Sequence, residues 1–394
     1  MEAVSYQLLD ESWIRDAFPI LKEVTYLNVG TYGLMPEPAL FEFQAMQAEF
    51  ERSGVASDGT FHLKAEETRK RIAALVDADP EEIAFTRNAT DGINLVLAGM
   101  DWQPGDEVIT TTEEHEAVMH PLLYLQRIKG IRCQYVEVSP YAEVMIDRLN
   151  QAYSPKTRLI VLSYITCETG TRLPAIEICR WATEHDTPCL LDGAQASGAL
   201  PVNVRHLGCD YYASNGHKWM SGPKGTGFFY GRREALLKLT PANVGAGSLE
   251  HVDINTGLAE PFSTGQRFEF GTRAWALYAG LGSSLDWFAS IGWERVYGHI
   301  AALSDYLKRC ILQNQSLELL TPKKFAESSG LVSFVVRDRQ AGDVSQALRE
   351  KWHIHTRVVP HYNVIRISTA HFNNLQDIDL LMDALEQITK GRIE

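Results

Sequence analysis

The stretch around Lys218 carries residue types that suit covalent chemistry. Lys218 lies between the imidazole of His217 and the indole of Trp219, where an apolar run at 210–213 gives way to a loop containing glycines and a proline. A lysine partly withdrawn from water at such a place has a lowered pKa and can act as an amine nucleophile toward a carbonyl. A single loop lysine is more often simply solvated, so the groups upstream decide between the two interpretations.

Three further groups each stand at the end of a short apolar run. Asn88-Ala89-Thr90 opens an apolar helical stretch with small residues, whose free amides, hydroxyl and helix dipole favour a phosphate. His115 follows the run at 108–110, and Asp192 ends the run that begins at Cys189. Taken singly, these groups are an N-cap, a surface histidine, and a carboxylate that is costly to bury unless a cation meets it.

One cofactor, pyridoxal phosphate, uses all of these groups together. It needs an amine for its aldehyde, a carboxylate that keeps the pyridine nitrogen protonated, a phosphate cradle, and a ring that stacks on the pyridine. Lys218, Asp192, the start of the helix at Asn88 and His115 supply one each. A dinucleotide fingerprint or a P-loop fits poorly, because the glycines of 223–227 lead into a strand and have the wrong spacing.

The elements that position these residues alternate regularly from residue 82 onward. Strands that are apolar on both sides and separated by helices predict an α/β fold with a parallel sheet covered on both faces. The carboxyl ends of parallel strands meet at one edge, where ligands bind. The expected strands lie at 83–86, 108–110, 133–138, 158–165, 189–192, 210–213 and 228–230, and the expected helices at 38–52, 61–77, 88–97, 115–128, 143–153 and 173–185.

The alternation weakens after about residue 275, which predicts a smaller α+β domain packed with the N-terminal segment. Residues 5–20 have the pattern of a short amphipathic helix. We expect a large domain at 24–274 and a small domain made of 1–23 with 275–394. The expected small-domain helices are 276–291, 294–314, 342–352 and 376–389, with strands at 330–336 and 364–368.

Composition excludes several classes of protein. With 37 Lys and Arg against 50 Asp and Glu, the net charge of −13 repels phosphate backbones and argues against a nucleic-acid partner. No apolar run approaches a bilayer span, and Met1-Glu2-Ala3 lacks the form of a signal peptide, so we expect a cytoplasmic protein without a membrane partner. The six cysteines contain no Cys-x-x-Cys pair, which predicts reduced thiols and no metal site.

Two motifs carry a resemblance to a known family. Leu191-Asp192-Gly193-Ala194-Gln195, together with Gly216-His217-Lys218-Trp219 and Gly222-Pro223-x-Gly225, resembles the fold-type I pyridoxal-phosphate enzymes. Within them the chain is similar to the class V aminotransferase branch of cysteine desulfurases, selenocysteine lyases, cysteine/cystine C–S lyases and isopenicillin N epimerases, from Tyr26 to Arg366. The resemblance implies the PLP-dependent transferase fold, with a mostly parallel seven-stranded sheet and a smaller α+β domain, and a homodimer that binds an amino-acid substrate.

The resemblance also implies roles for individual residues. Lys218 would bind the cofactor aldehyde and remove the substrate α-proton, Asp192 would hold the pyridine nitrogen, Gln195 the phenolic oxygen, and His115 would stack on the ring. The phosphate would be held by Ala89, Thr90, Asn215 and His217, with Thr272 reaching across the dimer to the neighbour's phosphate. On the substrate side it implies Arg366 for the α-carboxylate, with Arg357, Asn28 and Gly30.

Departures from the family pattern bear on the reaction. In cysteine desulfurases a loop between the matches to Arg357 and Arg366 carries a nucleophilic cysteine, whereas 358–365 here is short and contains none. Cys167 stands where desulfurases usually have an asparagine. We therefore expect a lyase that cleaves a C–S bond of cysteine, cystine or an S-substituted cysteine by β-elimination, without an enzymic persulfide. The alternatives are an epimerase or aminotransferase of the same family, then a desulfurase or a non-catalytic member.

Overall fold

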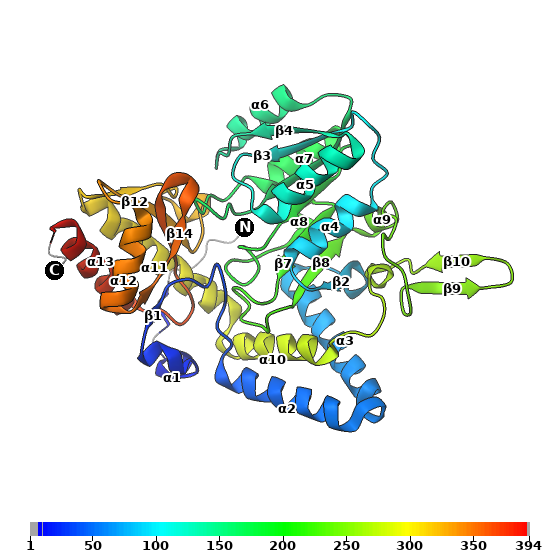
Figure 1. The fold of residues 1–394 in the computed structure, drawn as a ribbon, viewed down its shortest axis with the longest axis horizontal. Helices are drawn as coiled ribbons and strands as arrows, with labels where there is room; N and C mark the ends of the chain where they lie inside the picture. Colours follow the sequence, from blue (N-terminus) through cyan, green and yellow to red (C-terminus); the bar gives the residue numbers. More distant parts are fainter. Residues whose placement is uncertain (1–6, 10, 392–394) are drawn as a thin grey trace.

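A seven-stranded sheet forms the centre of the computed structural model, which describes residues 7–9 and 11–391 (Figure 1). Its strand order is β2-β8-β7-β6-β5-β3-β4, and β8 alone runs antiparallel to its neighbours. The predicted α/β class with a mostly parallel sheet is confirmed. The strands are β2 (Ile83–Thr86), β3 (Glu107–Thr111), β4 (Arg132–Val136), β5 (Thr157–Ser163), β6 (Cys189–Asp192), β7 (Tyr211–Asn215) and β8 (Gly227–Gly231).

Successive side chains of the central strands enter two different cores. On β5, Leu159 and Val161 belong to one buried cluster, whereas Ile160 and Leu162 belong to another. This follows from the period of two along a strand when both faces are covered. The sheet therefore has no solvent-exposed face along β5, and polar groups gather beyond its strand ends instead.

Helices cover both faces of this sheet. Ile93 of α4 and Leu122 of α5 pack in the cluster on one face, and Ile72 of α3, Ile178 of α7 and Leu281 of α10 pack in the cluster on the other. The helices of this part are α2 (Glu37–Ser53), α3 (Asp58–Val76), α4 (Ala89–Gly99), α5 (Glu116–Lys129), α6 (Ala142–Ala152), α7 (Ala175–Glu184), α8 (Val204–Leu207), α9 (Arg233–Leu236) and α10 (Trp275–Ile291).

A second, smaller sheet lies in the C-terminal part, at the left of Figure 1. Its strands are antiparallel in the order β11-β12-β15-β14, and a third buried cluster joins them to three helices. The elements are α11 (Trp293–Gln313), β11 (Leu317–Leu319), β12 (Leu331–Val336), α12 (Ala341–Trp352), β13 (Ile354–His355), β14 (Arg357–Val359), β15 (Val364–Ser368) and α13 (Leu375–Thr389).

The N-terminal segment joins this smaller part. Strand β1 (Thr25–Tyr26) pairs in parallel with β13, and Leu27 packs in the third cluster. We propose the division into 24–274 and 1–23 with 275–394; two contacts cross it, because β1 pairs with β13 and α10 packs in the core of the large sheet. The predicted helix at 5–20 is wrong in extent: α1 covers only Ser12–Asp16, before a 3-10 turn at Pro19–Lys22, and residues 5, 6 and 10 of the prediction lie outside the described residues.

A projecting hairpin is the element that the sequence pattern missed. Strands β9 (Leu249–Asp253) and β10 (Leu258–Pro261) pair only with each other and extend away from the rest of the chain (Figure 1). Val252 and Ile254 are exposed on it, at 61% and 93%. Because neither face is buried against this chain, the hairpin has no alternation of apolar and polar positions to reveal it.

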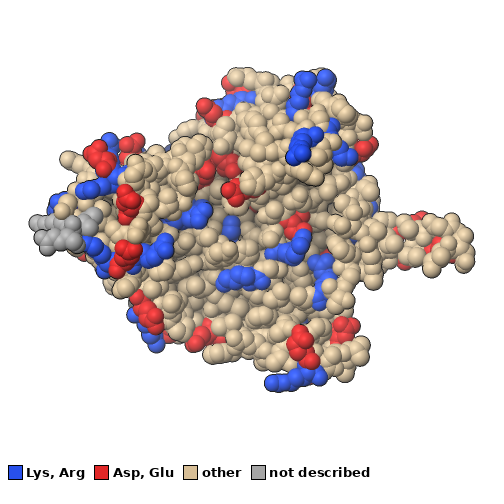
Figure 2. Space-filling model, in the orientation of Figure 1, with Lys and Arg blue, Asp and Glu red and all other residues tan. Residues whose placement is uncertain are grey.

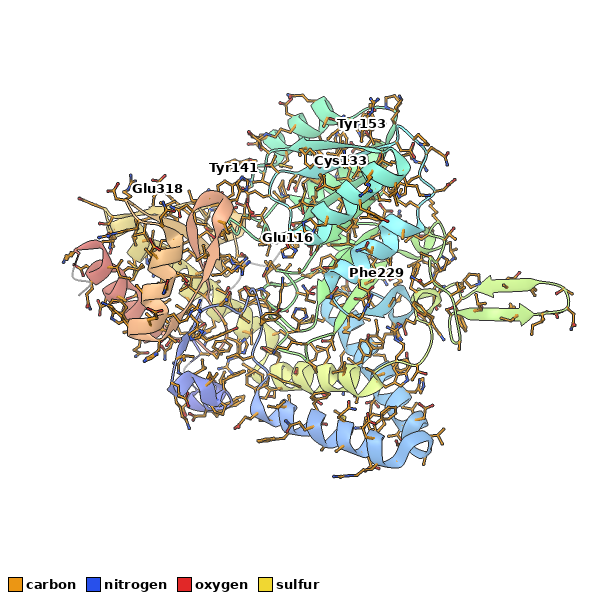
Figure 3. The ribbon with its side chains drawn as sticks, in the orientation of Figure 1. Glu116, Cys133, Tyr141, Tyr153, Phe229 and Glu318 are labelled. Carbon is orange, nitrogen blue, oxygen red and sulfur yellow. The ribbon has the colours of Figure 1, made fainter. Side chains whose placement is uncertain are left out.

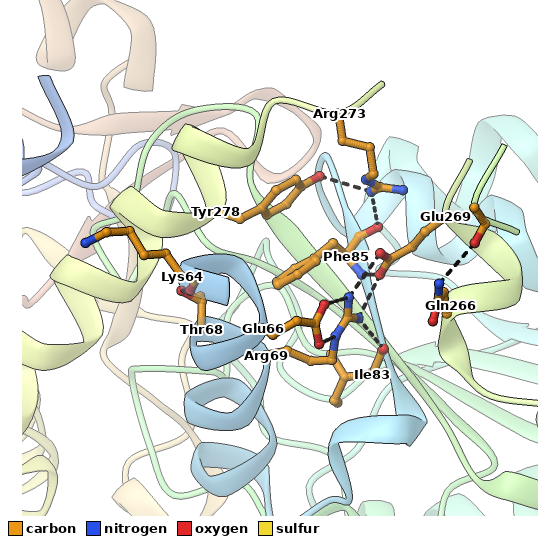
Figure 4. A network of polar contacts seen from close by, with 11 residues as sticks. Lys64, Glu66, Thr68, Arg69, Ile83, Phe85, Gln266, Glu269, Arg273 and Tyr278 are labelled. Carbon is orange, nitrogen blue, oxygen red and sulfur yellow. Dashed lines mark hydrogen bonds and ion pairs between the residues drawn. The ribbon is translucent and has the colours of Figure 1, made fainter. Parts of the chain in front are cut away.

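A buried ion pair fixes the segment that precedes α10 (Figure 4). Arg69 of α3 donates to both carboxylate oxygens of Glu269, at 2.7 and 3.0 Å, and to the carbonyl of Ile83 on β2. Glu269 also accepts from the amide of Phe85, at 2.6 Å. Three elements distant in sequence are thus joined at one point.

No helix among the described residues has the length and apolar character that crossing a bilayer requires.

Candidate active site

A cavity of about 390 Å³ opens at the carboxyl ends of the parallel strands. It lies at the position expected for a ligand in an open α/β sheet. Acidic and basic side chains face one another across the hollow in the middle of the surface in Figure 2. Of the predicted site residues, all but Asn28 and Thr272 line this cavity, namely Gly30, Ala89, Thr90, His115, Asp192, Gln195, Asn215, His217, Lys218, Arg357 and Arg366.

Lys218 lies three residues beyond the end of β7 and is 9% exposed. Burial lowers the pKa of its amine to about 8, with Asp192 opposing that shift and Arg366 adding to it. About a tenth of the amine is therefore neutral at pH 7, far more than for a solvated lysine, so Lys218 can act as a nucleophile or a base.

The polar groups of Asp192 and Gln195 are held by short contacts. Asp192 ends β6 at 4% exposure, and its Oδ1 accepts from the amide of Ala194 at 2.8 Å. The side-chain amide of Gln195 donates to the carbonyl of Gly30 at 3.0 Å, and its Oε1 accepts from the indole of Trp219 at 2.9 Å. A buried carboxylate and a fixed amide thus stand on the same wall as Lys218.

The N-terminal loop closes against the backbone of this segment. The amide of Gly33 donates to the carbonyl of His217 at 2.8 Å. A Cβ at position 33 would lie 2.0 Å from the carbonyl oxygen of Lys218, so only glycine allows this approach. The contact places Gly30 and Thr31 at the edge of the cavity.

His115 is the N-cap of α5, and its Nδ1 accepts from the amide of Ala117 at 3.0 Å. This hydrogen bond leaves the proton of a neutral ring on Nε2. Desolvation and the neighbouring Lys218 lower the pKa of His115, while Asp192 raises it. A largely neutral ring at the cavity wall suits stacking on an aromatic ligand. Glu116, labelled in Figure 3, is the first residue of α5 and lies on the side that faces the C-terminal part.

The start of α4 provides an anion cradle. The side chain of Asn88 caps the helix by accepting from the amide of Asp91 at 2.9 Å. Thr90, the residue before Asp91, lines the cavity. Asn215 Oδ1 accepts from the amide of Ala89 at 2.9 Å, so a direct contact of Ala89 with a phosphate stays a prediction. The helix dipole, the hydroxyl, the Asn215 amide and His217 together suit a phosphate group.

Arg366 lies on β15 at 5% exposure and has no carboxylate partner among the described residues. It donates to the carbonyl of Cys167 at 2.5 Å and to Thr31 Oγ1 at 3.2 Å, whereas its Nε has no acceptor. Burial lowers its pKa to about 10. Asn28 accepts from the same Thr31 hydroxyl at 2.7 Å, so it is linked to this arginine through Thr31. The unpaired planar fork suits the carboxylate of a ligand.

Glu114 and Ser163 also line the cavity, although neither is predicted as a site residue from the sequence. Glu114 lines the cavity next to His115 and accepts from Thr111 Oγ1 and from the amide and hydroxyl of Ser163, at 2.7, 3.0 and 2.7 Å. Burial raises the pKa of Glu114 to about 7. Because Ser163 is the last residue of β5, its place at a strand end was the available signal.

Thr272 lies apart from the cavity and is exposed. Its predicted contact with the phosphate of a neighbouring subunit therefore stays a prediction. No cluster of three or more His, Cys, Asp or Glu side chains within the described part of the chain has a metal-binding arrangement.

The residues present fit pyridoxal phosphate. An amine with a pKa of about 8, a buried carboxylate, a neutral imidazole and an anion cradle surround one cavity. The unpaired Arg366 adds a site for the carboxylate of an amino acid. These are the groups that this cofactor and its substrates require.

Comparisons with known proteins agree with this fit. The profile of the family described as "Aminotransferase class-V" matches residues 39–381. A probable cysteine desulfurase of Methanothermobacter thermautotrophicus is 29% identical over 95% of this chain and 97% of its own, and a cysteine desulfurase of Serratia proteamaculans is 30% identical over 96% and 98%.

Solved structures give the same result. A complex of the cystine C–S lyase C-DES with its reaction product cysteine persulfide has a TM-score of 0.86 and 31% identity, and covers 93% of this chain and 98% of its own. Another C-DES structure contains glycine covalently linked to the PLP cofactor, with a TM-score of 0.86, 31% identity and coverage of 94% and 98%. The chain therefore belongs to the class-V aminotransferase family of pyridoxal-phosphate-dependent enzymes.

Proposed function

We propose that this enzyme is a C–S lyase that acts on cystine or another S-substituted cysteine by β-elimination, without a persulfide on the protein. The observation that carries this proposal is the connection between Arg357 and Arg366. It consists of β14, a 3-10 turn at Pro360–Tyr362 and β15, with Val359 paired to Val364, and it contains no cysteine. A sulfur acceptor on this connection is therefore missing.

Cys167 is the one cysteine among the described residues that lines the cavity, and its chemistry also supports a lyase. Burial raises the pKa of its thiol to about 12, although Arg366 and Lys218 oppose the shift. Because the thiolate is the nucleophile, such a thiol is a poor sulfur acceptor near neutral pH. The likeness to the cystine C–S lyase C-DES points the same way, whereas the cysteine desulfurases among the relatives favour the alternative.

Bound pyridoxal phosphate supplies an electron-withdrawing ring that makes the α-proton of an amino acid acidic. In our proposal Arg366 binds the α-carboxylate, and the Lys218 amine takes the α-proton. Asp192 would keep a proton on the pyridine nitrogen, His115 would stack on the ring, and Gln195 would donate to the phenolic oxygen. Thr90, Asn215 and His217 would hold the phosphate with the start of α4, and the sulfur substituent would leave from the β-carbon of the substrate.

Product analysis tests the reaction. Cofactor-loaded protein is incubated with L-cystine and, separately, with L-cysteine, and pyruvate and alanine are quantified. Pyruvate with a persulfide product is expected from cystine, and Lys218→Ala should lose this turnover. Alanine as the main product would replace the proposal with a desulfurase reaction. Neither product from visibly loaded protein would favour the epimerase or aminotransferase alternative.

We also propose a homodimer in which Thr272 contacts the phosphate of the neighbouring subunit. The exposed apolar residues Val252 and Ile254 on the β9–β10 hairpin support an intermolecular role for that hairpin. Sedimentation analysis of wild type and of a chain lacking 250–260 tests it, and a monomeric wild type would overturn it.

The free thiols of all six cysteines are in keeping with the reducing cytoplasm, which we propose as the location.

A further inference from the structure

Glu168 is a cavity-lining carboxylate whose Oε2 has no well-aligned hydrogen-bond donor among the residues the structure describes. Its side chain is 19% exposed, and its Oε2 is shielded from solvent. The nearest positively charged or protonatable group is His361 Nδ1, at 3.4 Å from Oε2. His361 itself is 66% exposed on the 3-10 turn at 360–362 and is charged only when protonated.

Two other cavity carboxylates, Glu114 and Asp192, are better satisfied, and a third, Glu116, is exposed to solvent. Glu114 accepts three hydrogen bonds, and Asp192 accepts one from the amide of Ala194. Glu113, just outside the cavity, accepts from Thr169 at 2.7 Å and from Tyr362 at 3.4 Å. A partly buried carboxylate without donors is unfavourable unless a ligand supplies them.

Glu168 lies next to the group that we assign to the substrate α-carboxylate. The carbonyl of Cys167, the preceding residue, accepts from Arg366 at 2.5 Å. Lys218 lines the same cavity, so a substrate held by Arg366 and deprotonated by Lys218 leaves the rest of the cavity for its sulfur substituent. Val358, Val359, Pro360 and Glu168 also line the cavity.

We propose that Glu168 binds an ammonium group at the far end of the sulfur substituent, so that the preferred substrates are S-substituted cysteines carrying an amine beyond the sulfur. This inference rests on the proposed C–S lyase function. The charged groups that face Glu168 are His361, Glu113 and Arg366. An ammonium would supply charge and hydrogen-bond donors to a carboxylate whose nearest partner, His361, is exposed and charged only when protonated.

For a mixed disulfide R–S–S–CH2–CH(NH3⁺)–COO⁻ the reaction balances with one water. Elimination breaks the Cβ–S bond, and the sulfur leaves with its electron pair and takes a proton as R–S–SH. Hydrolysis of the remaining three-carbon fragment gives pyruvate and NH4⁺. No oxidant or reductant is consumed.

Three mixed disulfides of L-cysteine test the inference, because only their cysteine half can be deprotonated at an α-carbon. The partners are cysteamine, which carries an ammonium, 3-mercaptopropionate, which carries a carboxylate, and 2-mercaptoethanol, which is neutral. Pyruvate formation by the cofactor-loaded wild type should give a kcat/KM for the cysteamine disulfide roughly tenfold or more above that for the neutral one, mainly through KM. Equal values for these two probes would overturn the proposal without any variant.

Variants then assign the preference to one residue. Glu168→Gln should reduce the ratio of cysteamine to 2-mercaptoethanol disulfide toward one, and Glu168→Asp should keep part of it. Glu137→Gln is the matched control, because it removes the same charge from a carboxylate that is 78% exposed outside the cavity. An unchanged ratio in Glu168→Gln, or an equal loss with all three probes, would overturn the inference while pyruvate still supports the lyase. No pyruvate from any disulfide would instead refute the proposed function.

The same preference should appear in binding without turnover. Calorimetric titration of cofactor-loaded Lys218→Ala with the cysteamine and 2-mercaptoethanol disulfides should give the same order of affinity. A lack of discrimination there would contradict a direct contact with Glu168.

Discussion

Arg357 and Arg366 are register partners on the antiparallel strands β14 and β15. Both line the cavity, and Arg357 contributes to the lowered pKa of Arg366. Side chains of such partners project from the same face of a sheet about 5 Å apart, and like charges there are destabilising. The described chain gives Arg366 no carboxylate partner, so this pair of cations is arranged for an anionic ligand.

Replacing Arg366 by glutamine should therefore affect substrate binding more than the cofactor. We expect KM for L-cystine to rise roughly hundredfold, because a charge-assisted contact to the α-carboxylate is lost. The visible absorbance of bound cofactor should stay unchanged. Arg337→Gln is the control, since Arg337 is 54% exposed and pairs with Glu318 outside the cavity. Wild-type KM in Arg366→Gln would remove this arginine from the substrate site.

The contact between Trp219 and Gln195 predicts a separable effect on the cofactor site. Trp219→Phe removes the indole donor that holds Gln195 Oε1 at 2.9 Å. We expect a loss of about 1 kcal/mol in the free energy of unfolding, together with weaker cofactor binding and a shifted cofactor absorbance.

Trp181→Phe provides a matched control for that change. The indole of Trp181 donates to Asn150 Oδ1 at 2.8 Å, and neither residue lines the cavity. A similar loss of stability is expected there, with unchanged cofactor affinity and absorbance. If both variants alter the cofactor spectrum equally, the Trp219 contact has no specific role in positioning Gln195.

The pKa of Lys218 gives a pH dependence with a defined sign. The folded value of about 8 lies below the ordinary value of 10.5, so the folded protein binds fewer protons than the unfolded protein between these values. The cofactor-free wild type should therefore gain stability relative to Lys218→Met as the pH rises from about 8 to about 10.5. Urea unfolding of both proteins across this range measures the difference, and a difference that does not vary with pH would contradict the lowered pKa.

Covalent uptake of pyridoxal phosphate should follow the same group. Only the neutral amine attacks an aldehyde, so the rate of uptake by cofactor-free protein should increase with pH and level off above about 8. Stopped-flow absorbance follows this reaction. A midpoint near 10.5 would mean that the amine is solvated before the cofactor binds.

The sequence was sufficient to place the principal groups of the site because strand ends determine them. Asp192 and Lys218 stand directly after apolar runs, and the parallel arrangement of β6 and β7 brings their ends to one edge of the sheet. The family resemblance added Arg366, which no local pattern marks as functional.

Other features depend on contacts that have no local signature. The approach of Glu168 to His361 joins the segment after β5 to a short turn in the C-terminal part, and nothing in either stretch indicates that they meet. Strand β14 covers only three residues and β13 two, which is too short for a period to be visible, whereas a short strand at Thr25–Tyr26 is predicted from the sequence and is confirmed as β1. Tertiary pairing alone determines β13 and β14.

The buried pair of Arg69 and Glu269 should contribute strongly to stability (Figure 4). The two side chains are 7% and 5% exposed, and Glu269 also accepts from the Phe85 amide of β2. Glu269→Gln leaves the guanidinium in a buried place with one carboxylate fewer, so we expect a loss of about 3 kcal/mol in the free energy of unfolding. Glu66→Gln removes the other carboxylate of the same arginine, but Glu66 is 51% exposed, so a loss below about 1 kcal/mol is expected.

Urea unfolding of the two cofactor-loaded variants compares the two ion pairs of Arg69. Because Glu269 also fixes the segment before α10, only its variant should weaken cofactor binding if Thr272 serves a neighbouring subunit. Equal losses of stability in the two variants would show that burial does not distinguish the two ion pairs.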